Sequence, residues 1–258
     1  MKSKTNRTVF ILLGIGLTAG IMGGLLGIGG GVLIVPALVF FLAFEQHRAH
    51  GTSLAIVIML SLVGVITYLV HHNVDLLFSA GIAVGGMVGA IIGGSIVQHI
   101  KSKALRRMFC VFLIASAAKM IYDGCVVTHA AAAHAVAFSA SGALLAMGTG
   151  MLTGLLSAIL GVGGGIVMVP TLTMLLGFGQ TIAQGTSLAA MLPIAFTGML
   201  KHRKLGNVDF RVALWVGSGA AVGAFGGSLL ANVLQPGALK LTFGIFLVIM
   251  AALMVAKK

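Results

Sequence analysis

The sequence predicts an all-α polytopic membrane protein made of two inverted-topology repeats of about five segments each. Three observations predict this class: the apolar composition, an internal repeat and the placement of basic residues. Hydrophobic residues fill 59% of the 258 positions and charged residues only 8%, whereas soluble domains carry about 25% charged residues. Such a chain has too few polar side chains to cover a water-exposed surface, and it is too hydrophobic to be disordered.

A repeat with an offset of 134 residues runs through most of the chain. The matching pairs are GIGGGVLIVP at 27–36 with GVGGGIVMVP at 161–170, GTSLA at 51–55 with 185–189, and NVD at 73–75 with 207–209. We therefore expect a first membrane repeat at 1–124, an extracytoplasmic linker at 125–138 and a second membrane repeat at 139–258. Internal duplication is a common build for secondary transporters.

Each repeat contains five hydrophobic segments in the same order. They lie at about 9–26, 31–44, 52–70, 76–97 and 104–122, and again at about 139–160, 164–177, 186–200, 210–232 and 238–256. The second segment of each repeat directly follows the glycine-rich motif. As a helix its 14 residues reach only ~21 Å, less than the ~30 Å hydrocarbon core of a bilayer. We expect this segment to be broken or re-entrant.

The basic residues predict which ends of the segments face the cytoplasm. With a cytoplasmic amino terminus, five crossings per repeat place nearly all basic clusters on one side, as the positive-inside rule requires. These clusters are Lys2–Arg7, Arg48, Lys101–Arg107, Lys201–Arg211 and Lys257–Lys258. Both termini are then cytoplasmic, and an odd number of crossings inverts the second repeat. Lys119 and Lys240 are exceptions, each near a predicted outer end.

The net charge of +12 therefore reports topology, and we expect no nucleic-acid partner. The amino-terminal stretch resembles a signal peptide, but its counterpart in the second repeat predicts that it is retained.

The four carboxylates limit the class of cargo. Each lies at or near the end of a segment, at Glu45, Asp75, Asp123 and Asp209. Buried carboxylates are how many cation and proton carriers hold their ions, so this pattern favours neutral or anionic cargo. Neither the two cysteines nor the histidines show strong metal-ligand spacing, and no nucleophile–base arrangement indicates an enzyme. We expect no catalytic residue, metal or cofactor.

The glycine-rich motif is the strongest candidate for a binding site. Glycines destabilise a helix by about 1 kcal/mol each relative to alanine, and unwound backbone inside a membrane is tolerated where it is buried or lines a cavity. Free N–H groups at the following helix start can hold an anion. We assign substrate binding to Gly29, Gly30, Gly31, Gly163, Gly164 and Gly165, and a structural role to Pro36 and Pro170. Close helix packing through small residues is the alternative.

The Gly-Thr-Ser motif supplies the other candidate ligands. At an expected helix start, Thr52, Ser53, Thr186 and Ser187 either cap the helix or donate hydrogen bonds to an oxyanion. Polar residues precede both copies, His50 in the first and Gln184 in the second. We interpret the Asn-Val-Asp motifs as helix caps, and the glycines at 85, 89, 93, 219, 223 and 227 as sites of close helix approach.

At these residues the chain resembles the sulfite exporter TauE/SafE family of bacterial membrane permeases. The doubled G-x-GGG…P…GTSLA pattern, the length and the ten short segments carry the resemblance over nearly the whole chain. It implies a permease of the bacterial cytoplasmic (inner) membrane that carries sulfite, organosulfonates or related sulfur-containing anions.

Combined with the residues, the resemblance predicts a secondary transporter of small anions, embedded in the lipid bilayer, that works by alternating access between inverted repeats. A passive anion channel of the same architecture and a non-transporting membrane assembly protein are the alternatives.

Overall fold

The computed structural model describes residues 2–96, 102–126, 140–160 and 164–256, with side chains at 9–92, 110–125, 142–155 and 164–253. Within these ranges every regular element is an α-helix, which confirms the predicted fold class. The helices are α1 Lys2–Leu26, α2 Gly31–Leu42, α3 Gln46–Val70, α4 Leu76–Ile96, α5 Ser102–Val126, α6 Ala140–Leu160, α7 Gly165–Leu175, α8 Gln180–Lys204, α9 Phe210–Val233 and α10 Pro236–Ala256.

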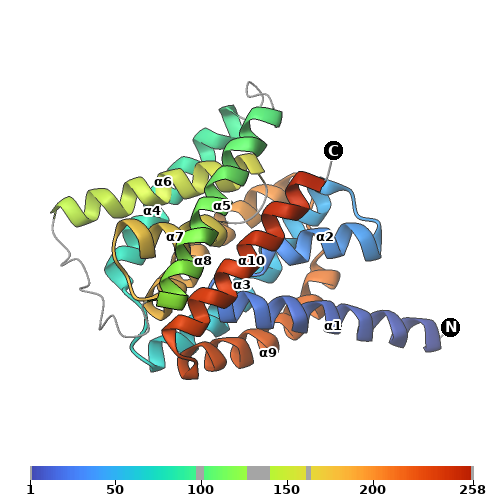
Figure 1. The fold of residues 1–258 in the computed structure, drawn as a ribbon. Helices are drawn as coiled ribbons and strands as arrows, with labels where there is room; N and C mark the ends of the chain where they lie inside the picture. Colours follow the sequence, from blue (N-terminus) through green and yellow to red (C-terminus); the bar gives the residue numbers. More distant parts are fainter. Residues whose placement is uncertain (1, 97–101, 127–139, 161–163, 257–258) are drawn as a thin grey trace.

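The most extensive helix contacts join the two predicted repeats. Helix α1 packs along α9 and α6 packs along α4, and the 134-residue offset converts one pair into the other. Helix α3 packs on α8, and α5 on α10, so that equivalent helices meet. Figure 1 shows α1 beside α9, with α5 and α10 side by side across the front. The inverted membrane orientation and the domain boundaries stay predictions.

Glycines bring the backbones of these helices together. A Cβ added to the described members of the four-residue glycine series would collide with a backbone oxygen of the partner helix, so nothing larger than hydrogen fits there. The contacts pair Gly85 with Met147, Gly89 with Met151, Gly219 with Leu13, Gly223 with Leu17 and Gly227 with Ile21. The expected role of these glycines is confirmed, while Gly93 lies outside the described side chains.

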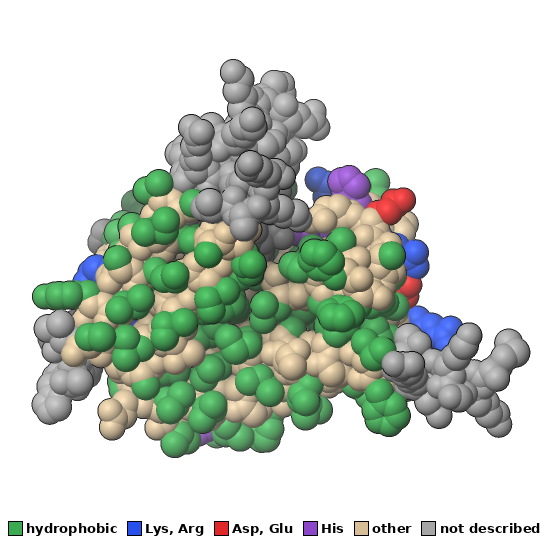
Figure 2. All heavy atoms as spheres, turned by 45° about the vertical axis from the view of Figure 1, so that its right-hand side comes forward, with side chains coloured by type: hydrophobic (Ala, Val, Ile, Leu, Met, Phe, Trp, Pro, Cys, Tyr) green, Lys and Arg blue, Asp and Glu red, His purple; other side chains and the backbone are tan. Residues whose placement is uncertain are grey.

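Five of the helices described here are long and apolar enough to cross a membrane. The segments are Val9–Leu26, Gln46–Val70, Gln180–Lys204, Phe210–Val233 and Pro236–Leu253. Figure 2 shows hydrophobic side chains spread over the broad middle of one face, with charged side chains and histidines toward its edges. Helices α2 and α7 have only 12 and 11 residues, which confirms that the segment after each glycine-rich motif is short.

Helices α3 and α8 begin earlier than the hydropathy predicts. They start at Gln46 and Gln180 instead of at residues 52 and 186. The extra turns contain no proline, and the fully buried Ala49 and Ala183 anchor them against the interior. The Gly-Thr-Ser motifs therefore lie inside helices, and the expectation that they cap a helix start is wrong.

Substituting glycines on the two faces of α9 tests the packing. Gly223→Ala drives a Cβ into the Leu17 carbonyl, and we expect a loss of about 1–3 kcal/mol from overpacking. Gly226, on the same helix, has nothing within 4 Å, so Gly226→Ala gains helix propensity at no steric cost. Thermal unfolding in detergent should show a lowered Tm for Gly223→Ala only. Equal midpoints for both variants would show that the α1–α9 contact does not depend on close backbone approach.

Candidate functional site

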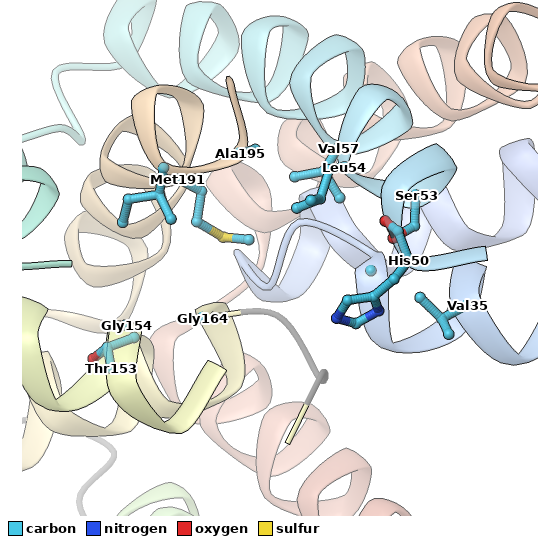
Figure 3. Close-up of a pocket in the computed structure, with 12 residues that line it drawn as sticks. Val35, His50, Ser53, Leu54, Val57, Thr153, Gly154, Gly164, Met191 and Ala195 are labelled. Atoms are coloured by element: carbon cyan, nitrogen blue, oxygen red, sulfur yellow. Dashed lines mark hydrogen bonds between the residues drawn. The ribbon is translucent and has the colours of Figure 1, made fainter. Parts of the chain in front are cut away.

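A small cavity lies where the two glycine-rich motifs meet α3, α6 and α8. Its volume is about 60 Å³, which is enough for a few water molecules. The lining residues are Gly31, Val35, His50, Ser53, Leu54, Val57, Thr153, Gly154, Gly164, Met191, Ile194 and Ala195. Figure 3 shows the His50 ring reaching into the space between α2 and α3 on one side and Gly164 on the other. The cavity brings together four predicted site residues: Gly31, His50, Ser53 and Gly164.

The first glycine-rich motif is unwound, as predicted. Gly27, Gly29 and Gly30 have φ angles of 69°, 67° and 65°, in the left-handed region that side chains other than glycine disfavour. Helix α1 ends before this turn, and α2 begins after it at the cavity wall. The carbonyl of Gly30 accepts hydrogen bonds from the N–H groups of Leu33 and Ile34 at 2.9 and 3.0 Å, which closes the first turn of α2.

The second glycine-rich motif is described from Gly164 onward, and Gly163 lies outside the described residues. Gly164 has right-handed helical angles, φ −66° and ψ −28°, and its carbonyl accepts hydrogen bonds from Val167 and Met168. A Cβ at Gly165 would collide with the backbone of Ile28. The two motifs are therefore in direct contact, and both short helices begin beside the cavity.

The carbonyl groups at the break after α1 find partners on α3 and α8. The Tyr68 hydroxyl donates to the Gly24 carbonyl at 2.8 Å, with Gln184 Oε1 at 3.3 Å from the same hydroxyl. Ser187 Oγ donates to the Gly27 carbonyl at 2.9 Å. The last carbonyls of a helix lack partners within it, so these side chains hold the unwound loop against α8. Ser187 thus binds the loop, Gln184 packs against Gly27, and neither lines the cavity.

The threonines of the Gly-Thr-Ser motifs bond to the Asn-Val-Asp loops of the opposite repeat. Thr52 Oγ1 accepts from the N–H of Asp209 at 3.0 Å, and Thr186 Oγ1 accepts from the N–H of Asp75 at 2.9 Å. Both threonines are fully buried. We name this paired arrangement the Thr–Asp contacts. Neither threonine lines the cavity, so the structure does not bring them together with Gly31 and His50.

The aspartates of these loops cap the next helix, as predicted. Asp75 Oδ1 accepts from the Phe78 N–H at 2.9 Å, and Asp209 Oδ1 accepts from the Val212 N–H at 3.0 Å. The motif glycines make room for the loops, because a Cβ at Gly51 or Gly185 would collide with the carbonyl of Asn207 or Asn73 respectively. The sequence contained a signal for this contact. The Gly-Thr-Ser and Asn-Val-Asp motifs both recur at the 134-residue offset, and both are polar in an apolar chain.

The prolines and serines complete the list of predicted site residues. Pro36 and Pro170 lie inside α2 and α7, where proline removes one backbone hydrogen bond. Ser53 lines the cavity while its Oγ donates to the His50 carbonyl at 2.8 Å. Gly29 lies against α8, since a Cβ there would collide with the Met191 side chain.

A larger cavity of about 400 Å³ lies at the end of the molecule where α8 and α10 begin. Gln180 lines it, is 2% exposed, and has neither amide atom hydrogen-bonded. Lys240 also lines it, and Lys119 pairs with Asp123 at 2.9 Å. The two lysines that broke the basic pattern therefore have local roles, one in an ion pair and one beside a polar cavity.

An ion pair joins the amino-terminal end of α3 to the residue just before α9. Arg48 Nη2 lies 2.7 Å from Asp209 Oδ2, and the guanidinium lies 4.5 Å from the Phe44 ring centroid. Burial acts to raise the pKa of Asp209, but the Val212 N–H and the hydrogen bond and charge of Arg48 outweigh it. The pKa of this carboxyl is therefore lower than usual.

Comparison with known proteins identifies relatives of this architecture. The chain matches the family described as Sulfite exporter TauE/SafE over residues 1–120 and 145–258. The probable membrane transporter protein YunE of Bacillus subtilis is 29% identical over 244 residues, which cover 85% of this chain and 86% of the relative.

A probable membrane transporter protein of Methanocaldococcus jannaschii is 33% identical over 172 residues, or 64% of this chain and 61% of the relative. A third, from Xylella fastidiosa, is 27% identical and covers 88% of this chain and 87% of the relative. No solved structure matches the chain.

Thr52→Val tests the Thr–Asp contacts. Valine keeps the shape but leaves the Asp209 N–H without its acceptor, and an unsatisfied buried group costs about 1–3 kcal/mol. We expect Tm in detergent to fall by several degrees. Thr197→Val is the matched control, because Thr197 is exposed and bonds only to carbonyls of its own helix. A similar drop for both variants would show that the loss comes from the hydroxyl alone and not from the contact between repeats.

The Arg48–Asp209 pair predicts a pH-dependent stability. Because the folded-state pKa of Asp209 is lowered, its stabilising effect is complete above the unfolded pKa of about 3.9 and disappears as the pH falls through the folded value. Arg48→Gln should therefore lower Tm at pH 7, and the difference from the unmodified protein should shrink at pH 3. A difference that is constant between pH 7 and pH 3 would contradict the ion pair as its cause.

Proposed function

Because the chain belongs to the Sulfite exporter TauE/SafE family, we propose that it is a secondary transporter of small sulfur-containing anions such as sulfite or organosulfonates. One observation carries the proposal: the starts of the two short helices, one from each repeat, meet at a cavity. The first N–H groups of a helix lack intrahelical partners and favour negative charge. Among the residues described as lining this cavity, none is a carboxylate.

His50 and Gly31 are the ligands that we assign first. The Nδ1 atom of His50 is buried without a hydrogen-bond partner, and the N–H of Gly31 begins α2 at the cavity wall. Gly164, the residue just before α7, also lines the cavity. An oxyanion accepts hydrogen bonds from several directions, which suits donors that converge from two repeats.

The two sides of the cavity differ, and the difference supports alternating access. On one side Ser187 and Tyr68 bind the carbonyls of Gly27 and Gly24, so this loop is held against α3 and α8. On the other side the positions equivalent to Gln184 and Ser187 are His50 and Ser53, which line the open space. We propose that transport exchanges these arrangements between repeats in the cytoplasmic membrane, with both termini in the cytoplasm. An inside-negative potential favours export by ~2.3 kcal/mol per negative charge per 100 mV.

Counterflow in proteoliposomes tests the function. We expect saturable exchange of radiolabelled sulfite that unlabelled methanesulfonate or thiosulfate inhibits. Gly30→Leu should reduce the rate about tenfold or more, because leucine at φ 65° is strained and its Cβ lies 2.9 Å from Leu60 Cδ1. The variant Gly226→Ala, at an exposed position with nothing within 4 Å, should transport normally.

Three outcomes would change the conclusion. Full exchange by both Gly30→Leu and Gly164→Leu, at normal membrane levels, would reject the glycine loops as the site. Flux without saturation or counterflow would identify a passive channel. No flux of any of these anions would favour a membrane protein that carries no such cargo.

A further inference from the structure

Two histidines replace a neutral pair at equivalent ends of α3 and α8. The 134-residue offset relates His50 to Gln184 and Tyr68 to His202. At one end of the helix pair, Tyr68 and Gln184 approach to 3.3 Å, and Tyr68 also bonds to Gly24. A phenol and an amide are neutral near pH 7, whereas an imidazole takes up a proton in this range. The chain therefore has a titratable pair where its other half has a neutral one.

The two rings lie edge to face, and both residues are half-buried. Their centroids are 6.1 Å apart and their planes cross at 70°. The Nδ1 atoms of both His50 and His202 are buried and have no hydrogen-bond partner. Gly51 makes the approach possible, because a Cβ there would lie 2.8 Å from the His202 Cβ. A buried nitrogen without a partner is unfavourable. An anion that accepts a hydrogen bond from the ring relieves this cost, and it also stabilises a proton on the ring.

The charged groups around the two histidines disfavour a proton on either ring unless an anion binds nearby. His47 and Lys201 are the titratable neighbours that act on the rings. The carboxylate of Asp209, from the loop packed at this end of α3, is already paired with Arg48 at 2.7 Å. Like charges oppose protonation of a second group nearby. An anion in the cavity beside His50 supplies the missing negative charge, and by linkage the proton strengthens anion binding equally.

We infer that the His50–His202 pair binds one proton together with the transported anion, so that the protein is an anion–proton symporter. This inference rests on the proposed transport function. A ring nitrogen takes the proton from water on one side of the membrane and returns it to water on the other, and no covalent bond to the anion forms. The proton removes one negative charge from the carried complex. A monovalent sulfonate then crosses as a neutral complex that the potential does not drive, and the pH gradient replaces the potential as the driving force.

The double variant His50→Gln/His202→Tyr makes a matched test, because it copies the Gln184–Tyr68 pair that the fold already accommodates. Radiolabelled methanesulfonate is the probe, since a sulfonate binds no proton near neutral pH and any proton moved must come through the protein. In proteoliposomes with the potential clamped at zero, an inward proton gradient of one pH unit should drive about tenfold accumulation for one proton per anion. A trapped pH dye should report acidification of the lumen.

The double variant should lose both accumulation and acidification. Because His50 is also an assigned ligand, its counterflow should slow, and the methanesulfonate that still exchanges should move no protons. His72→Asn, which changes an exposed histidine at the other end of α3, should behave as the unmodified protein. Two results would overturn the symport: accumulation by the double variant at the unmodified level, or counterflow by the unmodified protein without proton movement. Absence of counterflow in the unmodified protein would instead count against sulfonates in the proposed function.

A measurement independent of transport tests the pair itself. In nanodiscs with ¹³C-labelled histidine, the His50 resonance should titrate with a midpoint that shifts by about one pH unit in His202→Tyr, as coupled sites do. Sulfite at saturating concentration should also shift this midpoint, and leave that of His72 in place. A His50 midpoint that neither change moves would reject the proton-binding pair whatever the cargo.

Discussion

A backbone group that leaves a helix inside a bilayer has no water to bond with, so the protein itself must provide the partner. This requirement explains the side-chain contacts at the break after α1. Where α1 ends, the carbonyls of Gly24 and Gly27 receive hydroxyl donors from Tyr68 and Ser187. The donors come from α3 and α8, and the break in one repeat is therefore completed partly by the other. A cavity can exist between the motifs because the carbonyls at the break are already satisfied.

The repeat architecture could be predicted because the signals for it can be found in the sequence itself. The apolar composition, the 134-residue offset and the short segment after each glycine-rich motif are visible without any three-dimensional information. The glycine series at 85, 89, 219, 223 and 227 predicted close helix approach for the same reason. The starts of α3 and α8 were missed, since their first turns are polar and are anchored by the burial of Ala49 and Ala183.

The candidate site could be predicted only in part. Gly31, Gly164, His50 and Ser53 meet at the cavity, but Thr52 and Thr186 bond to Asp209 and Asp75 instead. The sequence shows that these positions carry hydroxyl groups. It does not show which group of the other repeat each hydroxyl bonds to. Tyr68 was not singled out, and His202 was interpreted only as part of the basic cluster at Lys201–Arg211. Their contacts with Gln184 and His50 appear only when α3 and α8 are placed side by side.

The exchange of partners between repeats has a consequence for how the chain is made. Helix α1 is synthesised long before the helix that it packs against, because α9 is complete only when residue 233 has been translated. At 5–20 residues per second this interval lasts roughly ten to forty seconds. Throughout that time the glycine-lined face of α1 meets lipid or an insertion factor instead of its partner. The first repeat therefore stays in the membrane without its main packing partners. The final architecture forms late, when helices that are already inserted dock against one another.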